Sequence, residues 1–105
     1  MEEVRIIVAT DFTQTPGGRW IKLGPFSGEL FFKDWLLPKY AEARSIGSIL
    51  HIYLDGVRSY PSSFLDQSFG ELYRQQGDDV KTRLVFHAEE KAWVIDYIKT
   101  EIWNE

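Results

Sequence analysis

Two serine hydroxyls and two aspartate carboxylates lie around the start of one segment of the chain. Ser62 and Ser63 follow Pro61, Asp66 comes three residues after Ser63, and Asp55 ends the apolar run before them. If a helix begins at the serines, its free backbone N–H groups and its dipole favour an anion there. A serine hydroxyl in this position can also accept a phosphoryl group. These residues therefore suggest anion binding or a phosphorylation switch.

A structural role for the same residues is to cap the helix. Ser62 or Ser63 can accept a hydrogen bond from a free N–H group, and Pro61 suits the approach to a helix or its first turn. Asp66 stands three residues after Ser63, as in a capping box with a shorter acid. Capping is our first interpretation of the serines, and phosphorylation of Ser62, before Ser63, is the alternative.

A strand, a turn and a helix are expected to position these groups. Residues 49–54 are almost all apolar, and a run of this length is typical of a strand buried on both faces. Asp55 and Gly56 form a turn signal that ends it. The next apolar residues recur at helical spacing and form one stripe: Phe64, Leu65, Phe69, Leu72 and Tyr73. Because ligands collect at the carboxyl ends of parallel strands, this unit is the predicted site.

The first part of the chain predicts a hairpin. Residues 4–9 are rich in β-branched side chains and predict a strand. Residues 13–18 contain Pro-Gly-Gly and predict a turn, after which residues 19–23 can return as a short antiparallel strand.

A helix is predicted next, with Ser27 as its cap and its end near Arg44. Pro38 lies inside this helix, where it removes a hydrogen bond and clashes with the preceding turn. We therefore expect a kink or a break near Leu37.

The last part of the chain predicts a strand and a helix after a stop at Gly77. Residues 80–88 alternate in polarity, which predicts a strand with one buried face. Residues 89–103 predict a helix with the apolar stripe Trp93, Val94, Tyr97, Ile98 and Ile102. The order β-β-α-β-α-β-α predicts an α/β fold with helices packed on a mixed four-stranded sheet.

Composition limits the class of protein. The 105 residues are 44% hydrophobic, so we expect one folded domain spanning residues 1–105. The absence of cysteine excludes disulfides, thiolate metal sites and cysteine nucleophiles. A net charge of −4 gives no basic footprint for nucleic acid, and no apolar run approaches membrane-spanning length. We expect a cytoplasmic monomer or weak homodimer without a cofactor, a metal, or a nucleic-acid or membrane partner.

The two histidines are the remaining chemical candidates. His51 and His87, with Asp55 or Tyr53, could form a metal or acid–base site. No second motif supplies further ligands, so we expect local hydrogen bonds instead. The mixed faces of the predicted strands carry Trp20, His51, Tyr53, Arg83 and His87. If these faces coincide, they form an incompletely covered aromatic surface of the kind that marks partner sites.

Two motifs give the chain a resemblance to a known fold. Ser27-Gly28-Glu29 precedes the first long helix, and Ser62-Ser63-Phe64-Leu65-Asp66 opens the second. With the strand at 49–54 and the Asp55-Gly56 turn, these residues resemble the STAS domain of anti-sigma factor antagonists and sulfate-transporter tails. The chain is more closely similar to a family of prokaryotic STAS-like domains of unknown function that carry both motifs. The resemblance implies a STAS-like fold over most of the chain.

The resemblance also implies a function. Antagonists of this fold bind a partner kinase of the histidine-kinase ATPase superfamily, and phosphorylation of one serine at the second helix start switches that binding. By position this serine corresponds to Ser62, whereas Pro61 and Phe64 replace an aspartate and a glycine of the antagonist motif. STAS-like domains often occur beside ATPase modules of the same superfamily, so the implied partner is such an ATPase.

Two functions are compatible with these residues. The first is a non-enzymatic regulatory module that binds a partner protein through Asp55, Ser62, Ser63, Phe64 and Asp66. The second is a nucleotide or small-anion binding domain that uses the same helix start. No positioned base beside Ser62 can be identified, which argues against catalysis. We favour the interaction module.

Overall fold

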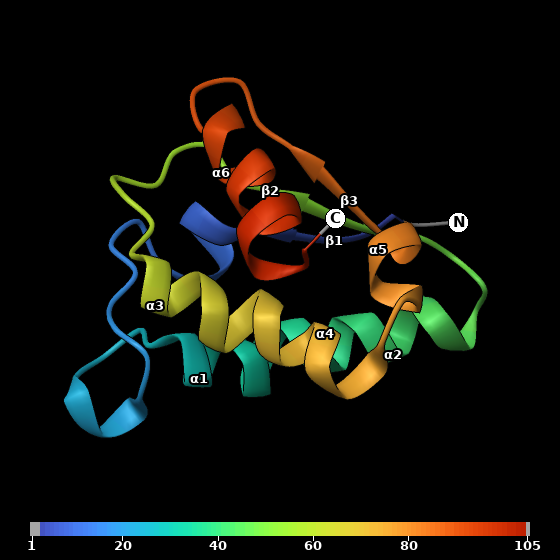
Figure 1. Cartoon of the computed structure of the whole chain (residues 1–105), viewed down its shortest axis with the longest axis horizontal. Coiled ribbons are helices and arrows are strands. Elements are labelled where there is room, and N and C mark those ends of the chain that lie inside the picture. Colours follow the sequence, from blue (N-terminus) through green and yellow to red (C-terminus); the bar gives the residue numbers. More distant parts are fainter. Residues whose placement is uncertain (1–2, 105) are drawn as a thin grey trace.

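The computed structural model describes residues 3–104, which contain a three-stranded sheet with helices packed against it (Figure 1). The strands are β1 (Val4–Ile7), β2 (Leu50–Tyr53) and β3 (Leu84–His87), and they lie in this order. Both pairings are parallel, with Ile6 opposite Ile52 and Ile52 opposite Phe86. The predicted α/β class is confirmed, but the predicted mixed four-stranded sheet is wrong.

The missing strand is the second one of the predicted hairpin. Residues 19–23 form a loop in which only η2 (Ile21–Leu23) is regular, as a single 3₁₀ turn. The backbone N–H of Glu29 donates to the carbonyl oxygen of Arg19 at 3.0 Å, so this loop is tied to the next helix instead of to β1. Five residues of alternation are too few to specify a strand when their backbone groups find partners elsewhere.

The first long helix is continuous over residues 28–45. Its parts are α1 (Gly28–Phe31), η3 (Phe32–Leu36) and α2 (Leu37–Ser45). Ser27 caps it as predicted, because its Oγ accepts a hydrogen bond from the N–H of Leu30 at 3.1 Å. We predicted a kink or a break near Leu37; the helix does not break there but contains the π-helical turn η3, in which the N–H of Leu37 donates to the carbonyl oxygen of Phe32. This wider turn precedes the proline ring, where a regular α-turn would clash.

The second long helix follows β2 and covers residues 62–76. Its parts are α3 (Ser62–Leu65), η4 (Asp66–Gly70) and α4 (Glu71–Gln76). The turn before it has Gly56 at φ 87°, and the helix stops at Gly77 with φ 76°, both as predicted. The predicted stripe is confirmed: Phe64, Leu65, Phe69 and Leu72 are fully buried, and Tyr73 is half-buried against the same core.

Residues 80–83 are helical, which corrects the predicted start of the last strand. They belong to α5 (Asp79–Arg83), which precedes β3. The guanidinium of Arg83 donates to the carboxylate of Asp79 at 2.8 Å, an i, i+4 pair that stabilises a helical turn. Val80 points from this helix into the core. A strand could bury it equally well, so its apolar character does not distinguish a helix from a strand.

The chain closes with α6 (Ala92–Tyr97) and η5 (Ile98–Ile102). Val94 and Ile98 are buried as predicted, but Trp93 is 54% exposed and does not belong to the buried stripe. Trp103 is fully buried instead, and its indole N–H donates to the carbonyl oxygen of Phe69 at 3.1 Å. Within residues 3–104, no helix has both the length and the apolar character needed to cross a membrane.

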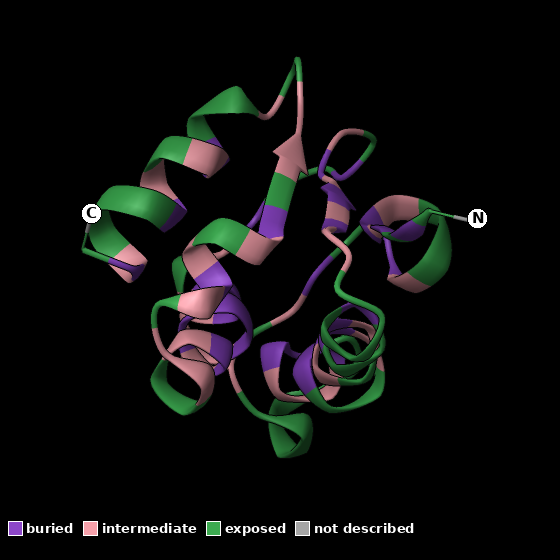
Figure 2. Ribbon diagram, turned by 90° about the vertical axis from the view of Figure 1, so that its right-hand side faces the viewer, coloured by how far each residue is buried: buried purple, intermediate pink, exposed green. Residues whose placement is uncertain are grey.

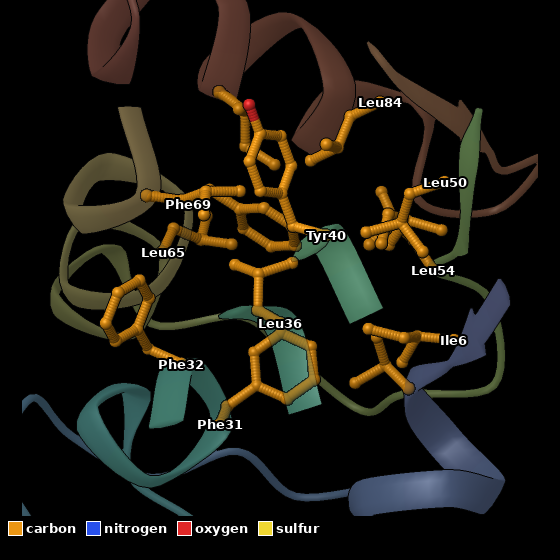
Figure 3. Packing of buried hydrophobic residues seen from close by; sticks show 14 of the residues in the cluster. Ile6, Phe31, Phe32, Leu36, Tyr40, Leu50, Leu54, Leu65, Phe69 and Leu84 are labelled. Atoms are coloured by element: carbon orange, nitrogen blue, oxygen red, sulfur yellow. The ribbon is translucent and has the colours of Figure 1, made fainter. Parts of the chain in front are cut away.

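The two long helices lie together against one face of the sheet (Figure 2). That face is buried through Val4, Ile6, Leu50, Ile52 and Leu84. Figure 3 shows Leu36, Tyr40 and Phe69 of the helices directed into the same core as Ile6 and Leu50. The opposite face, here called the open sheet face, carries exposed or half-buried side chains: Arg5, Ile7, His51, Tyr53, Val85 and His87. The prediction that β2 is buried on both faces is therefore wrong.

Candidate functional site at the start of the second long helix

The two serines lie in the first turn of α3. Ser62 is exposed and Ser63 is half-buried. The cap position belongs to Pro61, which is extended (φ −60°, ψ 142°), and no side chain caps the helix. The predicted capping role of Ser62 and Ser63 is therefore wrong.

Asp66 forms ion pairs in place of the predicted capping box. Its carboxylate accepts hydrogen bonds from Arg19 and, at 3.1 Å, from Arg74. Burial raises the pKa of Asp66, but these hydrogen bonds outweigh it and hold the pKa below the ordinary value. Asp66 thus anchors the loop that contains Arg19 to the second long helix. The partners are 47 positions apart in the chain, which explains why sequence spacing did not reveal the pair.

Asp55 holds the connection between β3 and α6. Its carboxylate accepts hydrogen bonds from the backbone N–H groups of Glu89 at 2.7 Å and Lys91 at 3.0 Å. The bond from Glu89 is the main cause of a pKa below the ordinary value for Asp55, although partial burial acts in the opposite direction. The visible role of Asp55 is therefore to order this connection.

Phe64 is a core residue in this structure. Its side chain has no exposed surface, and its ring centroid lies 5.5 Å from that of Phe31. The prediction that Phe64 contacts a partner is therefore wrong, because a fully buried ring offers no surface to a partner.

The Ser-Gly-Glu motif organises the same region. Ser27 caps α1, and the carboxylate of Glu29 accepts a hydrogen bond from the N–H of Ile21 at 2.9 Å. Gly28 allows close helix packing, because a Cβ there would lie 2.6 Å from the carbonyl oxygen of Phe64. The motif therefore starts the first long helix, joins it to α3 and holds the 17–26 loop.

The 17–26 loop is a feature that sequence reasoning missed. It presents four large apolar side chains that are between 39% and 68% exposed: Trp20, Ile21, Leu23 and Phe26. An open pocket of about 560 Å³ is lined by Trp20, Ile21, Lys22 and Glu29. A backbone hydrogen bond closes the loop, since the N–H of Gly17 donates to the carbonyl oxygen of Phe26 at 2.9 Å. The sequence signal for this exposed loop is that large apolar residues stand close together between Pro-Gly-Gly and Gly-Pro.

The base of this loop is held against the second long helix, and its η2 turn projects beside α1 (Figure 1). The Arg19 guanidinium reaches both Asp66 and, at 3.3 Å, Gln67. The ring of Phe12 lies 5.5 Å from Phe26 and 6.2 Å from Phe64, which connects the loop to the same helix turn. We call Trp20, Ile21, Leu23, Phe26, Ser62 and Ser63 the helix-start surface.

The predicted aromatic surface on the strands forms only in part. His51, Tyr53 and His87 lie together on the open sheet face, with the Tyr53 and His87 rings stacked at 4.5 Å. Trp20 belongs to the 17–26 loop, and Arg83 lies in α5, where it binds Asp79. In the part of the chain that the structure describes, no group of three His, Asp or Glu side chains is arranged to hold a metal ion.

Comparisons with known proteins identify the family. No curated protein and no solved structure matches the chain significantly. A family model described as "STAS-like domain of unknown function (DUF4325)" matches residues 27–92. The match begins at the Ser27 cap and extends through both long helices, β2 and β3 to the first residue of α6. The chain therefore belongs to the family of STAS-like domains of unknown function.

Proposed function

We propose that this domain is a non-enzymatic regulatory module that binds a partner protein through the helix-start surface. The observation that carries the proposal is the exposure of Trp20, Ile21, Leu23 and Phe26 in a loop that Arg19 joins to the helix beginning at Ser62. Neighbouring exposed apolar side chains with a polar rim are typical of protein-binding surfaces. Hydrogen bonds at Arg19 and Glu29 hold the loop in place, which reduces the entropy lost on binding.

Ser62 is the proposed switch within this surface. A phosphate there would add nearly two negative charges, about −1.5 to −2 at neutral pH, at a helix end whose dipole favours an anion. The same charge would stand on the surface that the proposed partner has to cover, so it would oppose binding. Ser62 is exposed, which a modifying enzyme requires.

The kind of partner to test first is an ATPase of the histidine-kinase superfamily. This choice rests on the resemblance to anti-sigma factor antagonists and on the proposed position of the switch. Pro61 and Phe64 differ from the antagonist motif. A kinase that reads an aspartate and a glycine there would not accept this loop, whereas an ATPase that only binds the surface would.

The alternative function is binding of a nucleotide or another small anion at the same helix start. The specific observation in its favour is that no side chain caps α3, so the N–H groups of its first turn can meet a ligand. A thermal-shift assay with ATP, GTP and inorganic phosphate distinguishes the two functions. An increase in melting temperature would favour the alternative, and an unchanged melting temperature favours the interaction module.

Affinity capture with variant baits tests the proposal. The baits are wild type, Leu23→Ser, Ser62→Ala and Ser62→Asp, and a histidine-kinase-superfamily ATPase is sought among the captured proteins. Trp93→Ser is the matched control for loss of an exposed apolar side chain, and Ser45→Asp is the control for an added charge. We expect the ATPase to be retained by wild type, Ser62→Ala and both controls and to be lost with Leu23→Ser and Ser62→Asp. Equal retention by all baits would contradict the proposed surface.

A further inference from the structure

The two histidines of the chain converge on the open sheet face. The register of β2 and β3 places Tyr53 opposite His87 and His51 opposite Val85, so the histidines are diagonal neighbours on one face. The Nδ1 atom of His51 lies 2.8 Å from the Nε2 atom of His87, and the ring centroids are 5.1 Å apart. One ring nitrogen from each histidine is therefore directed at the other.

Neighbouring side chains support this pair. The Tyr53 ring stacks on His87 with an interplanar angle of 14°, and the Tyr53 hydroxyl donates to Glu3 Oε1 at 3.0 Å. The same Glu3 oxygen is 3.7 Å from His51 Nδ1, and Arg5 lies 3.7 Å from the other oxygen of Glu3. The two imidazoles thus meet directly, and the Glu3 carboxylate lies close to one of them, held by a hydrogen bond from Tyr53.

We propose that His51 Nδ1 and His87 Nε2 bind a divalent transition-metal ion of the Zn²⁺ or Cu²⁺ class, with Glu3 as a third ligand. Imidazole nitrogens bind Zn²⁺ at about 2.0–2.1 Å, which separates two tetrahedral ligand atoms by roughly 3.3 Å. The observed separation of 2.8 Å is short of this value by about half an ångström, a change that small ring movements supply. For the metal to bind, the ring nitrogen that donates in this hydrogen bond releases its proton to solvent and the same ring takes up a proton at its other nitrogen, so that both rings direct a lone pair at the metal; water fills the remaining positions.

Glu3 has to turn toward the pair to become a ligand. Its Oε1 is 3.7 Å from His51 Nδ1, and no three such side chains converge as the described residues stand. The Glu3 side chain is partly exposed. To turn, it has to give up an exposed ion pair with Arg5 and a hydrogen bond from Tyr53. Mg²⁺ and Ca²⁺ prefer oxygen ligands, so a site with two imidazoles discriminates against them. This site is separate from the helix-start surface and does not depend on the proposed function.

Isothermal titration of tag-free protein with ZnCl₂ at pH 7.5 tests the site, with MgCl₂ as the control ion. We expect one Zn²⁺ per chain, no heat with Mg²⁺, and loss of binding at the same concentrations in His51→Gln and His87→Gln. Val85→Thr changes an exposed side chain on the same face that is not a proposed ligand, and this variant is expected to retain binding. Absence of Zn²⁺ binding by the wild type, or binding that persists in both histidine variants, would overturn the proposal.

Proton NMR of the wild type provides a test that needs no variant. Because the chain has two histidines, their ring protons give two resolvable sets of signals. We expect one equivalent of Zn²⁺ to shift both sets together. A shift of neither set, or of one set alone, would show that the pair does not bind the metal as a unit.

Discussion

Replacing Gly28 with alanine tests the packing that joins the two long helices. A Cβ at this position would lie 2.6 Å from the carbonyl oxygen of Phe64, 3.0 Å from Cβ of Gln67 and 3.2 Å from Cα of Phe64. The closest atom belongs to the backbone and cannot rotate away. The added methyl group therefore has to push the start of α1 away from α3 or distort one of the two helices.

Two effects of opposite sign set the size of the change. Alanine is the better helix former by up to about 1 kcal/mol, and by less at the first residue of a helix. Overpacking a well-packed contact costs typically about 1–3 kcal/mol. We expect the free energy of unfolding of Gly28→Ala to be lower by about 1–2 kcal/mol, which is about 4–16 °C in melting temperature for a domain of this size.

Urea unfolding followed by circular dichroism measures this difference. Gly18→Ala is the matched control, because a Cβ at Gly18 would meet only the end of the Leu23 side chain, at 4.0 Å. We expect the control to unfold near the wild-type urea concentration. If Gly28→Ala unfolds at or above the midpoint of the control, the close approach of the two helices is refuted.

Two further predictions concern stability. Ser27→Ala should lower the free energy of unfolding by about 1 kcal/mol because it removes a cap, whereas Ser62→Ala should change it by less than about 0.5 kcal/mol; equal effects in thermal unfolding would contradict the assignment of the caps. Hydrogen bonds from Arg83 and Tyr40 lower the pKa of Asp79 to about 2, so its carboxylate stabilises the folded state above an unfolded-state pKa of about 3.9 and loses this effect as the pH falls toward 2. After allowance for solvent screening, Asp79→Asn should cost about 1 kcal/mol at pH 7 and less near pH 2, and urea unfolding that gave the same difference at both values would exclude this role.

The parts of the fold that could be predicted are those in which a local pattern is long enough to have one solution. The apolar run at 49–54, Gly56 and the stripe from Phe64 to Leu72 predict β2, its turn and the second long helix. Ser27 is predicted as a cap because a hydroxyl directly before a helix has few better partners than its N–H groups.

The parts that could not be predicted depend on partners far away in the chain. Residues 19–23 alternate like a strand, but their backbone and side chains bind Glu29 and Asp66, so they form a loop. Residues 80–83 suit a strand or a helix, and the pair of Asp79 with Arg83 accompanies the helix.

The sequence predicted where the second long helix begins, but not which exposed side chains would form the candidate site around it. The exposure of Ser62 agrees with the predicted helix start, whereas Asp55 and Asp66 have structural partners and Phe64 is buried. Of the side chains that complete the surface, Trp20, Ile21 and Leu23 come from a segment that was expected to be a strand, and Phe26 follows it. Their position next to α3 follows from packing contacts of Phe12 and Arg19, which leave no periodic signal in the sequence.

The most direct test of the proposed function is the affinity of the captured and purified partner for wild type, Leu23→Ser and Trp93→Ser, measured by isothermal titration calorimetry. Leu23 is 68% exposed and Trp93 is 54% exposed, so both variants remove a large apolar side chain from the surface with little effect on the core. Burial of a leucine side chain contributes about 1.5–3 kcal/mol, so we predict that Leu23→Ser binds at least about tenfold more weakly while Trp93→Ser binds like the wild type. Equal affinities of all three proteins would contradict a partner site at the start of the second long helix.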